Sequence, residues 1–263
     1  MASTSGQSGN IVPDLNRLGD SLILTEDEDS GFVMSSGVWH VDPMVPGFLV
    51  VAGLLSVRSF HPDALQTALL TSFNPVRGME FKMLEGDRFL SKFFHAIDQQ
   101  RVLAGLPWAF NNNLFILAPV EPTDNLSFLN LDWCEFHIHI HGLPIGKMTK
   151  KVDSWIGNRL GKLKKVDMGP NGIMWGLSIR IRVAIDTTKP LRHVLKIRTI
   201  LGDEQLVTFI YERLPNFCYF CGHLGHISRA CELQFDDGFV DLGTTPRLAL
   251  GFGPPPQQFQ DVV

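Results

Sequence analysis

The segment with the most distinctive chemistry runs from Cys218 to Cys231 and reads CYFCGHLGHISRAC. Its spacing, C-x2-C-x4-H-x4-C, brings three thiolates and one imidazole around a single tetrahedral ion. Zn²⁺ suits this set because it has no geometric preference of its own and is usually four-coordinate in structural sites. We therefore predict one Zn²⁺ held by Cys218, Cys221, His226 and Cys231. All four positions are filled by protein, so no open position remains for a substrate.

The residues between the ligands fit a tight loop around a metal. Gly222 and Gly225 supply backbone freedom where the chain reverses. The segment has more large side chains than so small a unit can bury, so some should stay exposed for an unpaired base to stack on. We assign nucleic-acid contact here to Tyr219, Phe220, Ile227 and Arg229. The alternatives are a buried cysteine pair with a bystander histidine, and a closed zinc site that only stabilises a fold or holds a protein partner.

This segment resembles the zinc knuckle of plant retroelement proteins, where a CX2CX4HX4C unit follows a domain of unknown function in LINE-type elements. FLVVAGLL (48–55), RVLAGLPWAF (101–110), IHGLPIGKMT (140–149) and LPNFCYFCGHLGHI (214–227) resemble the family's landmarks, in the family's order. The resemblance extends from about residue 45 to 235. It implies the four zinc ligands above, an RNA-recognition-like βαββαβ domain around the first two landmarks, and no catalysis in this chain.

The composition favours a folded protein in a reducing compartment. The chain has 263 residues, 44% of them hydrophobic, which is enough for two modest cores. Cys134 is the one cysteine outside the motif, so no disulfide framework is available. FLVVAGLL is far shorter than the roughly 18 residues that span a bilayer, and the N-terminus lacks a secretory signal. We expect an intracellular protein of the nucleus or cytoplasm, with no membrane partner.

The net charge of −4 hides a division along the chain. Residues 146–199 contain thirteen basic and three acidic residues, a local net of +10, while the remainder carries −14. Such asymmetry indicates a polyanion partner. Arg180 and Arg182 alternate in a strand and should share one face, and we assign phosphate contact to them and to Lys164 and Lys165. The alternative is a solvated edge, or lysines that complement the dipole at a helix C-terminus.

Periodicity predicts an α+β protein that begins with a flexible acidic and polar segment (1–44). A ferredoxin- or RRM-like βαββαβ domain follows at 45–125. Both helices should cover one face of its sheet and leave the other free, the face on which RNA-recognition domains carry stacking aromatics. Phe89, Phe93 and Phe94 are the nearest substitutes here, although core packing is the favoured interpretation. Protein interaction or self-association is the alternative role for this domain.

A second, basic α+β extension is predicted at 130–213. It contains a strand through FHIHIHGLP, a helix at 152–163, and strands at 164–168, 176–186, 193–199 and 205–212. His137, His139 and His141 should share one strand face, but no carboxylate is evident at a fitting position, which disfavours a second metal site. Trp108 is expected to pack on the core of the first domain. The zinc motif (214–235) and a flexible Pro/Gly tail (236–263) complete the chain.

These features favour a zinc-dependent nucleic-acid-binding protein of retroelement origin, in which the basic segment and the zinc motif hold single-stranded RNA or DNA, with RNA the favoured partner. The alternative is a protein-interaction or self-association module whose zinc site is only structural. An enzyme with a small-molecule substrate is not expected, because neither G-x-x-x-x-G-K-[ST] nor G-x-S-x-G occurs.

Overall fold

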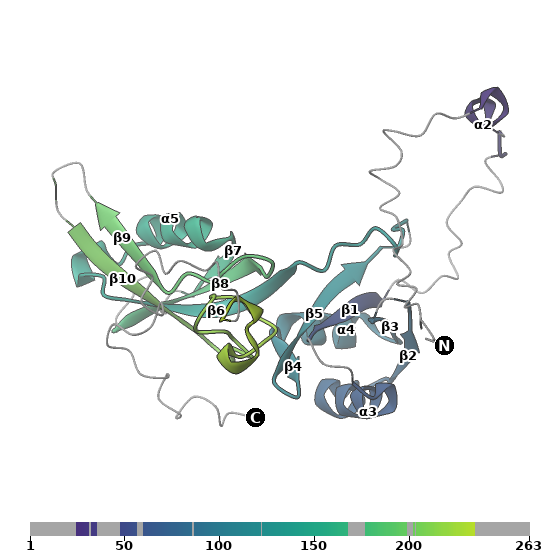
Figure 1. Ribbon diagram of the computed structural model, residues 1–263, viewed down its shortest axis with the longest axis horizontal. Helices are drawn as coiled ribbons and strands as arrows, with labels where there is room; N and C mark the ends of the chain where they lie inside the picture. The colour runs from purple at the N-terminus through teal and green to yellow at the C-terminus, as the bar shows by residue number, and fades with distance from the viewer. Residues whose placement is uncertain are drawn as a thin grey trace, which may run out of the picture.

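The computed structural model describes residues 25–31, 33–35, 48–56, 60–85, 87–121, 123–167, 177–198, 202 and 204–234. Two five-stranded antiparallel sheets with their helices give the predicted α+β fold (Figure 1). The predicted tail at 236–263 and most of the N-terminal segment lie outside these residues. In that segment, α2 (Glu26–Ser30) is a short helix where we predicted a flexible chain. Among the described residues, no helix is long and apolar enough to cross a membrane.

The first sheet follows the predicted βαββαβ order with one added strand. Its strands lie in the order β2-β3-β1-β5-β4. The addition, β4, pairs with β5 through Asn111 and Asn112, whose φ values of 49° and 61° are left-handed. Asparagine tolerates this conformation, which suits a tight hairpin. The elements are β1 (Leu49–Leu55), α3 (Pro62–Phe73), β2 (Met79–Met83), β3 (Arg88–Phe93), α4 (Ala96–Ala104), β4 (Trp108–Phe110) and β5 (Asn113–Val120).

One face of this sheet holds an aromatic core against the helices. Phe89 and Phe93 are fully buried there, and the Phe93 ring lies 6.4 Å from that of Phe73 in α3. Trp108 packs on Phe73 at 5.0 Å, and its indole N–H donates to the Val102 carbonyl at 2.8 Å. The core-packing interpretation is confirmed for Phe89, Phe93 and Trp108, but not for Phe94, which is 50% exposed. Phe89 and Phe93 cannot stack a base.

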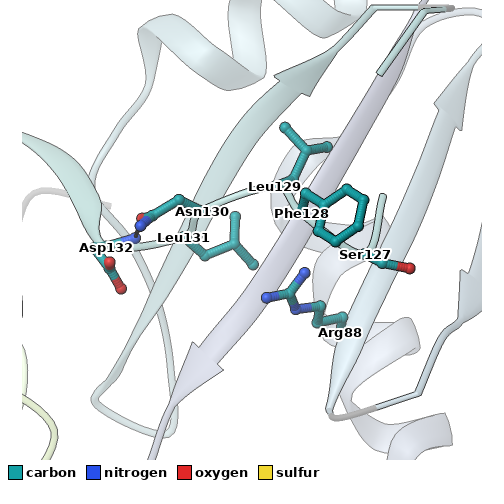
Figure 2. Close-up of a pocket in the computed structure, with 7 residues that line it drawn as sticks. All are labelled: Arg88, Ser127, Phe128, Leu129, Asn130, Leu131 and Asp132. Atoms are coloured by element: carbon teal, nitrogen blue, oxygen red, sulfur yellow. Dashed lines mark hydrogen bonds between the residues drawn. The ribbon is translucent and has the colours of Figure 1, made fainter. Parts of the chain in front are cut away.

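The opposite face of the first sheet, which we predicted would be free, is covered over β1 and β5, whereas Glu80 and Lys82 of β2 remain exposed on it. The segment 126–132 runs over it: Arg88 Nη1 donates to the Leu126 carbonyl at 3.0 Å, and Leu131 lies against Gly53. Figure 2 shows Arg88 among the side chains of this segment, which together line a pocket. The residues of this face that become buried include Val51, Leu114 and Ile116.

The second sheet has a buried face and an outer face, and β6 alternates between them along its whole length, whereas Val183, Ala184 and Ile185 of β8 are all buried. Its strands lie in the order β7-β8-β6-β10-β9, and the buried face packs against α5 through residues such as Ile138, Ile156 and Ile181. The other face carries the three histidines of β6 opposite the arginines of β8. The elements are β6 (Trp133–His141), η1 (Ile145–Lys147), α5 (Lys150–Leu160), β7 (Lys162–Val166), β8 (Ser178–Asp186), β9 (Val194–Arg198) and β10 (Glu204–Tyr211).

Helix α5 begins and ends two or three residues earlier than predicted. Thr149 caps it, because its hydroxyl accepts the Val152 N–H at 3.4 Å. The helix ends where Gly161 passes close to β8: a Cβ there would lie 2.2 Å from the Ala184 carbonyl oxygen. Lys164 and Lys165 therefore belong to β7. The interpretation that they complement a helix C-terminus was wrong.

The inner side of α5 also buries a carboxyl group. Asp153 is fully buried, and neither of its oxygens has a hydrogen-bond partner among the described residues. Burial raises the pKa of Asp153 to about 6. An ionised carboxylate without a partner is costly in such a place, so this side chain should oppose folding at neutral pH.

We expect Asp153→Asn to change the pH dependence of stability. The pKa is higher in the folded state, so the folded protein binds the proton more tightly and wild-type stability falls as pH rises from about 4 to about 6. The variant should lack this fall and gain about 1–3 kcal/mol in free energy of unfolding at pH 7. Chemical denaturation near pH 4 and pH 7 measures the difference. The exposed Asp63→Asn in α3 is the control, and equal stability of variant and wild type at pH 7 would contradict the prediction.

Candidate metal centre and basic sheet face

The four predicted zinc ligands come together in the structure. Cys218, Cys221, His226 and Cys231 each offer one ligand atom, and these atoms all lie within 4.8 Å of one another. The Cys221 sulfur is 3.3 Å from His226 Nε2. Cys218 and Cys231 are buried, and the other two are half-buried. Three sulfurs and one imidazole nitrogen at this separation are a donor set that suits Zn²⁺.

The backbone of this CCHC loop (residues 217–231) explains how so short a segment gathers its ligands. Cys218 and His223 close a turn, in which the Cys218 N–H donates to the His223 carbonyl at 2.9 Å. Gly222 and Gly225 have φ values of 81° and 92°, so both occupy the left-handed conformation that was expected of glycine here. The short helix η2 (Ser228–Ala230) then leads to the last ligand.

The sulfur atoms strongly affect one another's ionisation. Burial acts to raise the pKa of Cys218, but hydrogen bonds from the backbone of Cys221 and Phe220 outweigh it and lower that pKa. The Cys221 N–H lies 3.4 Å from the Cys218 sulfur. Burial and the neighbouring sulfur raise the pKa of Cys221 to about 12. A second thiolate at this site therefore needs a cation beside it, which is what a divalent metal supplies.

The CCHC loop is packed between the two sheets and does not form a separate domain. Phe217 and Leu224 are buried in the core. On the side of the second sheet, the Leu191 N–H donates to the Gly222 carbonyl at 2.7 Å. On the side of the first sheet, Gly225 lies against Leu55. Asn216, next to the loop, also contacts the first sheet through Asn112 at 2.8 Å and Asn113 at 2.9 Å.

The outer side of the CCHC loop keeps large side chains at the surface, as predicted. Tyr219 and Ile227 are 39% and 44% exposed, and Arg229 is also exposed. The Tyr219 ring lies edge-on to Phe217 at 5.1 Å, which fixes its position. Phe220 is half-buried, so less of its ring is available. Three of the four predicted contact residues in this loop therefore face solvent, and the fourth does so in part.

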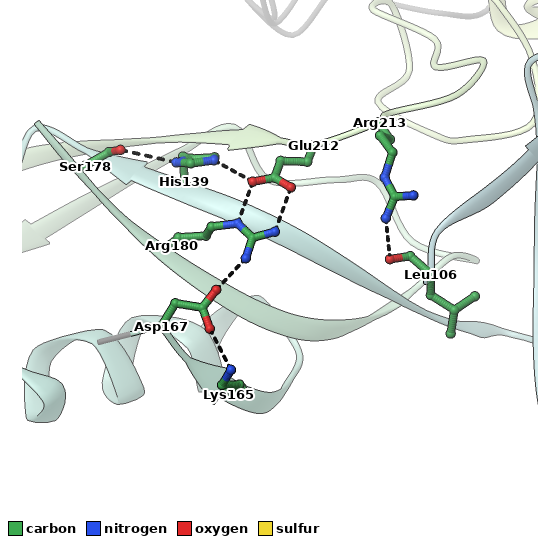
Figure 3. A network of polar contacts seen from close by, with 8 residues as sticks. All are labelled: Leu106, His139, Lys165, Asp167, Ser178, Arg180, Glu212 and Arg213. Carbon is green, nitrogen blue, oxygen red and sulfur yellow. Dashed lines mark hydrogen bonds and ion pairs between the residues drawn. The ribbon is translucent and has the colours of Figure 1, made fainter. Parts of the chain in front are cut away.

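Arg180 and Arg182 share the outer face of the second sheet, but carboxylates already occupy their guanidinium groups. Arg180 makes a bidentate pair with Glu212, at 2.6 and 2.9 Å, and also contacts Asp167 (Figure 3). Hydrogen bonds from Arg180 are the main cause that lowers the pKa of Glu212 to about 2. Arg182 pairs with Glu135 at 2.6 Å. It also donates to the carbonyl of Leu103, in helix α4 beside the first sheet, at 3.1 Å.

Lys164 and Lys165, the other two predicted phosphate contacts, also have acidic partners. Lys164 Nζ lies 3.6 Å from Glu135, and Lys165 Nζ lies 3.1 Å from Asp167. The sequence gives a local hint of the second pair, because Asp167 follows Lys165 by two residues. Glu135 and Glu212 are far from their partners along the chain, and no pattern near them could have revealed these contacts. The role of Lys164 and Lys165 as phosphate contacts stays a prediction.

The three histidines of β6 share one strand face, as predicted. His139 is held on both ring nitrogens, with Nδ1 3.2 Å from Ser178 and Nε2 2.6 Å from Glu212. The expectation that no carboxylate lies near was wrong, because Glu212 directly follows β10 and reaches this face. That carboxylate is shared with Arg180, so its charge is already neutralised.

A comparison with protein-family models matches residues 185–233 to a family described as a zinc knuckle. The match includes the CCHC loop and extends upstream through β9 and β10, the strands that precede it. Among curated proteins, an uncharacterized protein of Arabidopsis thaliana is 28% identical over 138 residues, which is 52% of this chain and 43% of that protein. The chain thus matches less than half the length of this plant relative.

Solved structures with some similarity include three that contain RNA-recognition domains or RNA. They are a Sxl-lethal protein/RNA complex (TM-score 0.24, 11% identity, 62% of this chain and 98% of that chain), RNA-recognition domains 1 and 2 of Sex-lethal from Drosophila melanogaster (0.23, 12%, 51% and 84%), and the first two RRM domains of the yeast poly(U)-binding protein Pub1 (0.22, 9%, 62% and 98%). TM-scores this low do not establish a common arrangement of the two sheets.

We expect loss of the metal to loosen more than the CCHC loop. Zinc-finger peptides gain roughly 10–16 kcal/mol from the metal, and here the loop also contacts both sheets. In Cys221→Ser, amide hydrogen exchange should accelerate at 217–231 and also near Leu191 and Asn112. Elemental analysis should find about one zinc per wild-type chain and a loss of zinc in the variant.

Cys134→Ser is the matched control, because Cys134 is buried in the second sheet and is not part of the ligand cluster. This control should retain zinc and wild-type exchange in the CCHC loop. Unchanged exchange near Leu191 and Asn112 in Cys221→Ser would show that the loop folds independently and would contradict this prediction.

Proposed function

We propose that this protein binds single-stranded nucleic acid, with one Zn²⁺ held by Cys218, Cys221, His226 and Cys231. The observation that carries the proposal is the assembled donor set, whose loop keeps Tyr219, Ile227 and Arg229 exposed on its outer side. An aromatic ring, an aliphatic side chain and a cation on one rigid loop are suited to an unpaired base and its phosphate. The match to a zinc-knuckle family supports the same function.

The proposed role of the zinc is structural. Four protein ligands fill its coordination sphere, so no position is left for a water nucleophile or a substrate. The metal would fix the loop so that the positions of Tyr219 and Ile227 are set before nucleic acid arrives. We therefore propose a binding protein and not an enzyme.

Single strands fit better than duplexes, because a side chain can stack only on a base that is not already stacked in a helix. RNA is the favoured partner, and the nucleus or cytoplasm the proposed location. The retroelement origin also stays a proposal, supported by the sequence landmarks and by the similarity to a plant protein over part of its length.

The competing proposal is a protein-interaction or self-association module with a purely structural zinc. One observation favours it: the inner side of the CCHC loop already joins the two sheets, so the metal has a structural task whether or not nucleic acid binds. The exposed outer side chains distinguish the two proposals, because the structural task does not require them.

We expect Tyr219→Ala to weaken binding of a labelled single-stranded RNA by about tenfold, because stacking on one base contributes roughly 1–3 kcal/mol. Fluorescence anisotropy at several salt concentrations measures the affinity, which should fall steeply as salt increases. Phe128→Ala is the matched control, since Phe128 is another half-exposed aromatic but lies in the segment 126–132 and not in the CCHC loop. Wild-type protein that retains no RNA, or binds with no salt dependence, would favour the protein-interaction module.

A further inference from the structure

The outer side of helix α5 carries a basic and aromatic stripe. Lys151, Trp155 and Arg159 are spaced four residues apart, which places them along one side of the helix. All three are exposed, as are Lys150 in the first turn of the helix and Lys147 in η1, just before it. We call these five residues the α5 stripe. The opposite side of the helix packs on the second sheet through Ile156 and Gly157, so the stripe takes no part in the core.

Among the described residues, the charges of the α5 stripe have no acidic partner, unlike most basic side chains of the neighbouring strands. In the part of the chain that the structure describes, no carboxylate lies within 4 Å of Lys147, Lys150, Lys151 or Arg159. By contrast, Arg180, Arg182, Lys164 and Lys165 each have an acidic partner. Positive charge that no carboxylate offsets is the part of a surface that can release counterions on binding a polyanion.

Helix stability does not explain the lysines of the α5 stripe. Lys150 and Lys151 lie in the first turn, where the positive end of the helix dipole disfavours cations. Asp153 is the acidic residue of this turn, but it is buried on the inner side. A phosphate group near this end would interact favourably with both lysines and with the dipole.

Trp155 adds a stacking surface to this charge. Its side chain is 46% exposed, although tryptophan is costly to leave in water. The Arg159 guanidinium lies 4.9 Å from the ring centroid and covers part of the indole, which orders the ring. A cation beside a partly exposed indole is an arrangement that accepts an unpaired base next to a phosphate.

We infer that the α5 stripe is a second contact surface for single-stranded nucleic acid, with lysines on phosphates and Trp155 stacked on a base. The inference rests on the proposed function, and it places this contact away from the strand arginines. Helix α5 covers the face of the second sheet opposite to the one that carries Arg180 and Arg182 (Figure 1). The Leu103 carbonyl of α4 accepts a hydrogen bond from Arg182 on the face that carries the arginines. The α5 stripe lies on the other side of the sheet, away from this contact.

The test measures binding of a labelled single-stranded RNA of mixed sequence to the full chain. Trp155→Ala should weaken affinity by about tenfold. The double variant Lys150→Glu/Lys151→Glu should also bind more weakly, and the slope of log K against log salt should become shallower by about 1.4, because about two phosphate contacts are lost. Lys82→Glu, at an exposed lysine of β2 in the first sheet, is the matched control and should bind like wild type.

Ultraviolet crosslinking to bromouridine-containing RNA gives a readout that a merely structural role would not produce. The crosslinked peptide should contain Trp155. Thermal melting of each variant checks that the fold is intact, and Trp155→Phe should retain most of the affinity because it keeps a ring.

The inference is overturned if Trp155→Ala and the lysine double variant bind like wild type while Tyr219→Ala is weakened; the proposed function would then stand alone. Equal weakening by Lys82→Glu and by the lysine variant would also overturn it, because the effect would then reflect net charge only. Failure of the wild-type protein to bind RNA would overturn the proposed function together with this inference.

Discussion

Convergence of three thiols and one imidazole within a fourteen-residue segment is the constraint on which the arrangement of this protein depends. Burial, together with the neighbouring sulfurs, raises the pKa of Cys221, so a cation is needed before this thiol ionises beside Cys218. With one, the loop becomes rigid, and its inner side can hold Gly222 against Leu191 and Gly225 against Leu55. The metal centre is thus coupled to the packing of both sheets. The same rigidity fixes the exposed side chains on its outer side.

The second organising feature is the pairing of acidic residues with some of the basic residues, which decides where unpaired positive charge remains. Residues 146–199 have a local net charge of +10, but folding brings Glu135, Glu204 and Glu212 from outside this range onto its strands. Glu135 and Glu212 neutralise Arg182 and Arg180, the arginines that we assigned to phosphate contact. The basic side chains of α5 have no such partners among the described residues, whereas most of the basic side chains on the strands do: Lys164, Lys165, Arg180, Arg182, Lys196 and Arg198.

The covering of the first sheet also limits where nucleic acid can bind. In a free RRM-like sheet this face would be the natural surface for bases, but residues 126–132 and the CCHC loop lie over it. The aromatic side chains of β3 that could have stacked bases face the helices instead and are fully buried. Nucleic-acid contact is therefore proposed on the metal loop and on α5, where large side chains remain exposed.

The sequence by itself determined the features that depend on neighbours along the chain. Ligand spacing identified the metal centre, and period-two alternation correctly placed Arg180 and Arg182 on one face of their strand and the three histidines of β6 on one face of theirs. Local patterns work there because each is set by a few consecutive residues. Tertiary structure alone decided which carboxylate pairs with which arginine and which segment covers the first sheet. It also decided that the CCHC loop contacts both sheets. These contacts join residues up to about a hundred positions apart, such as Asn112 and Asn216, and nothing in either local sequence specifies the other.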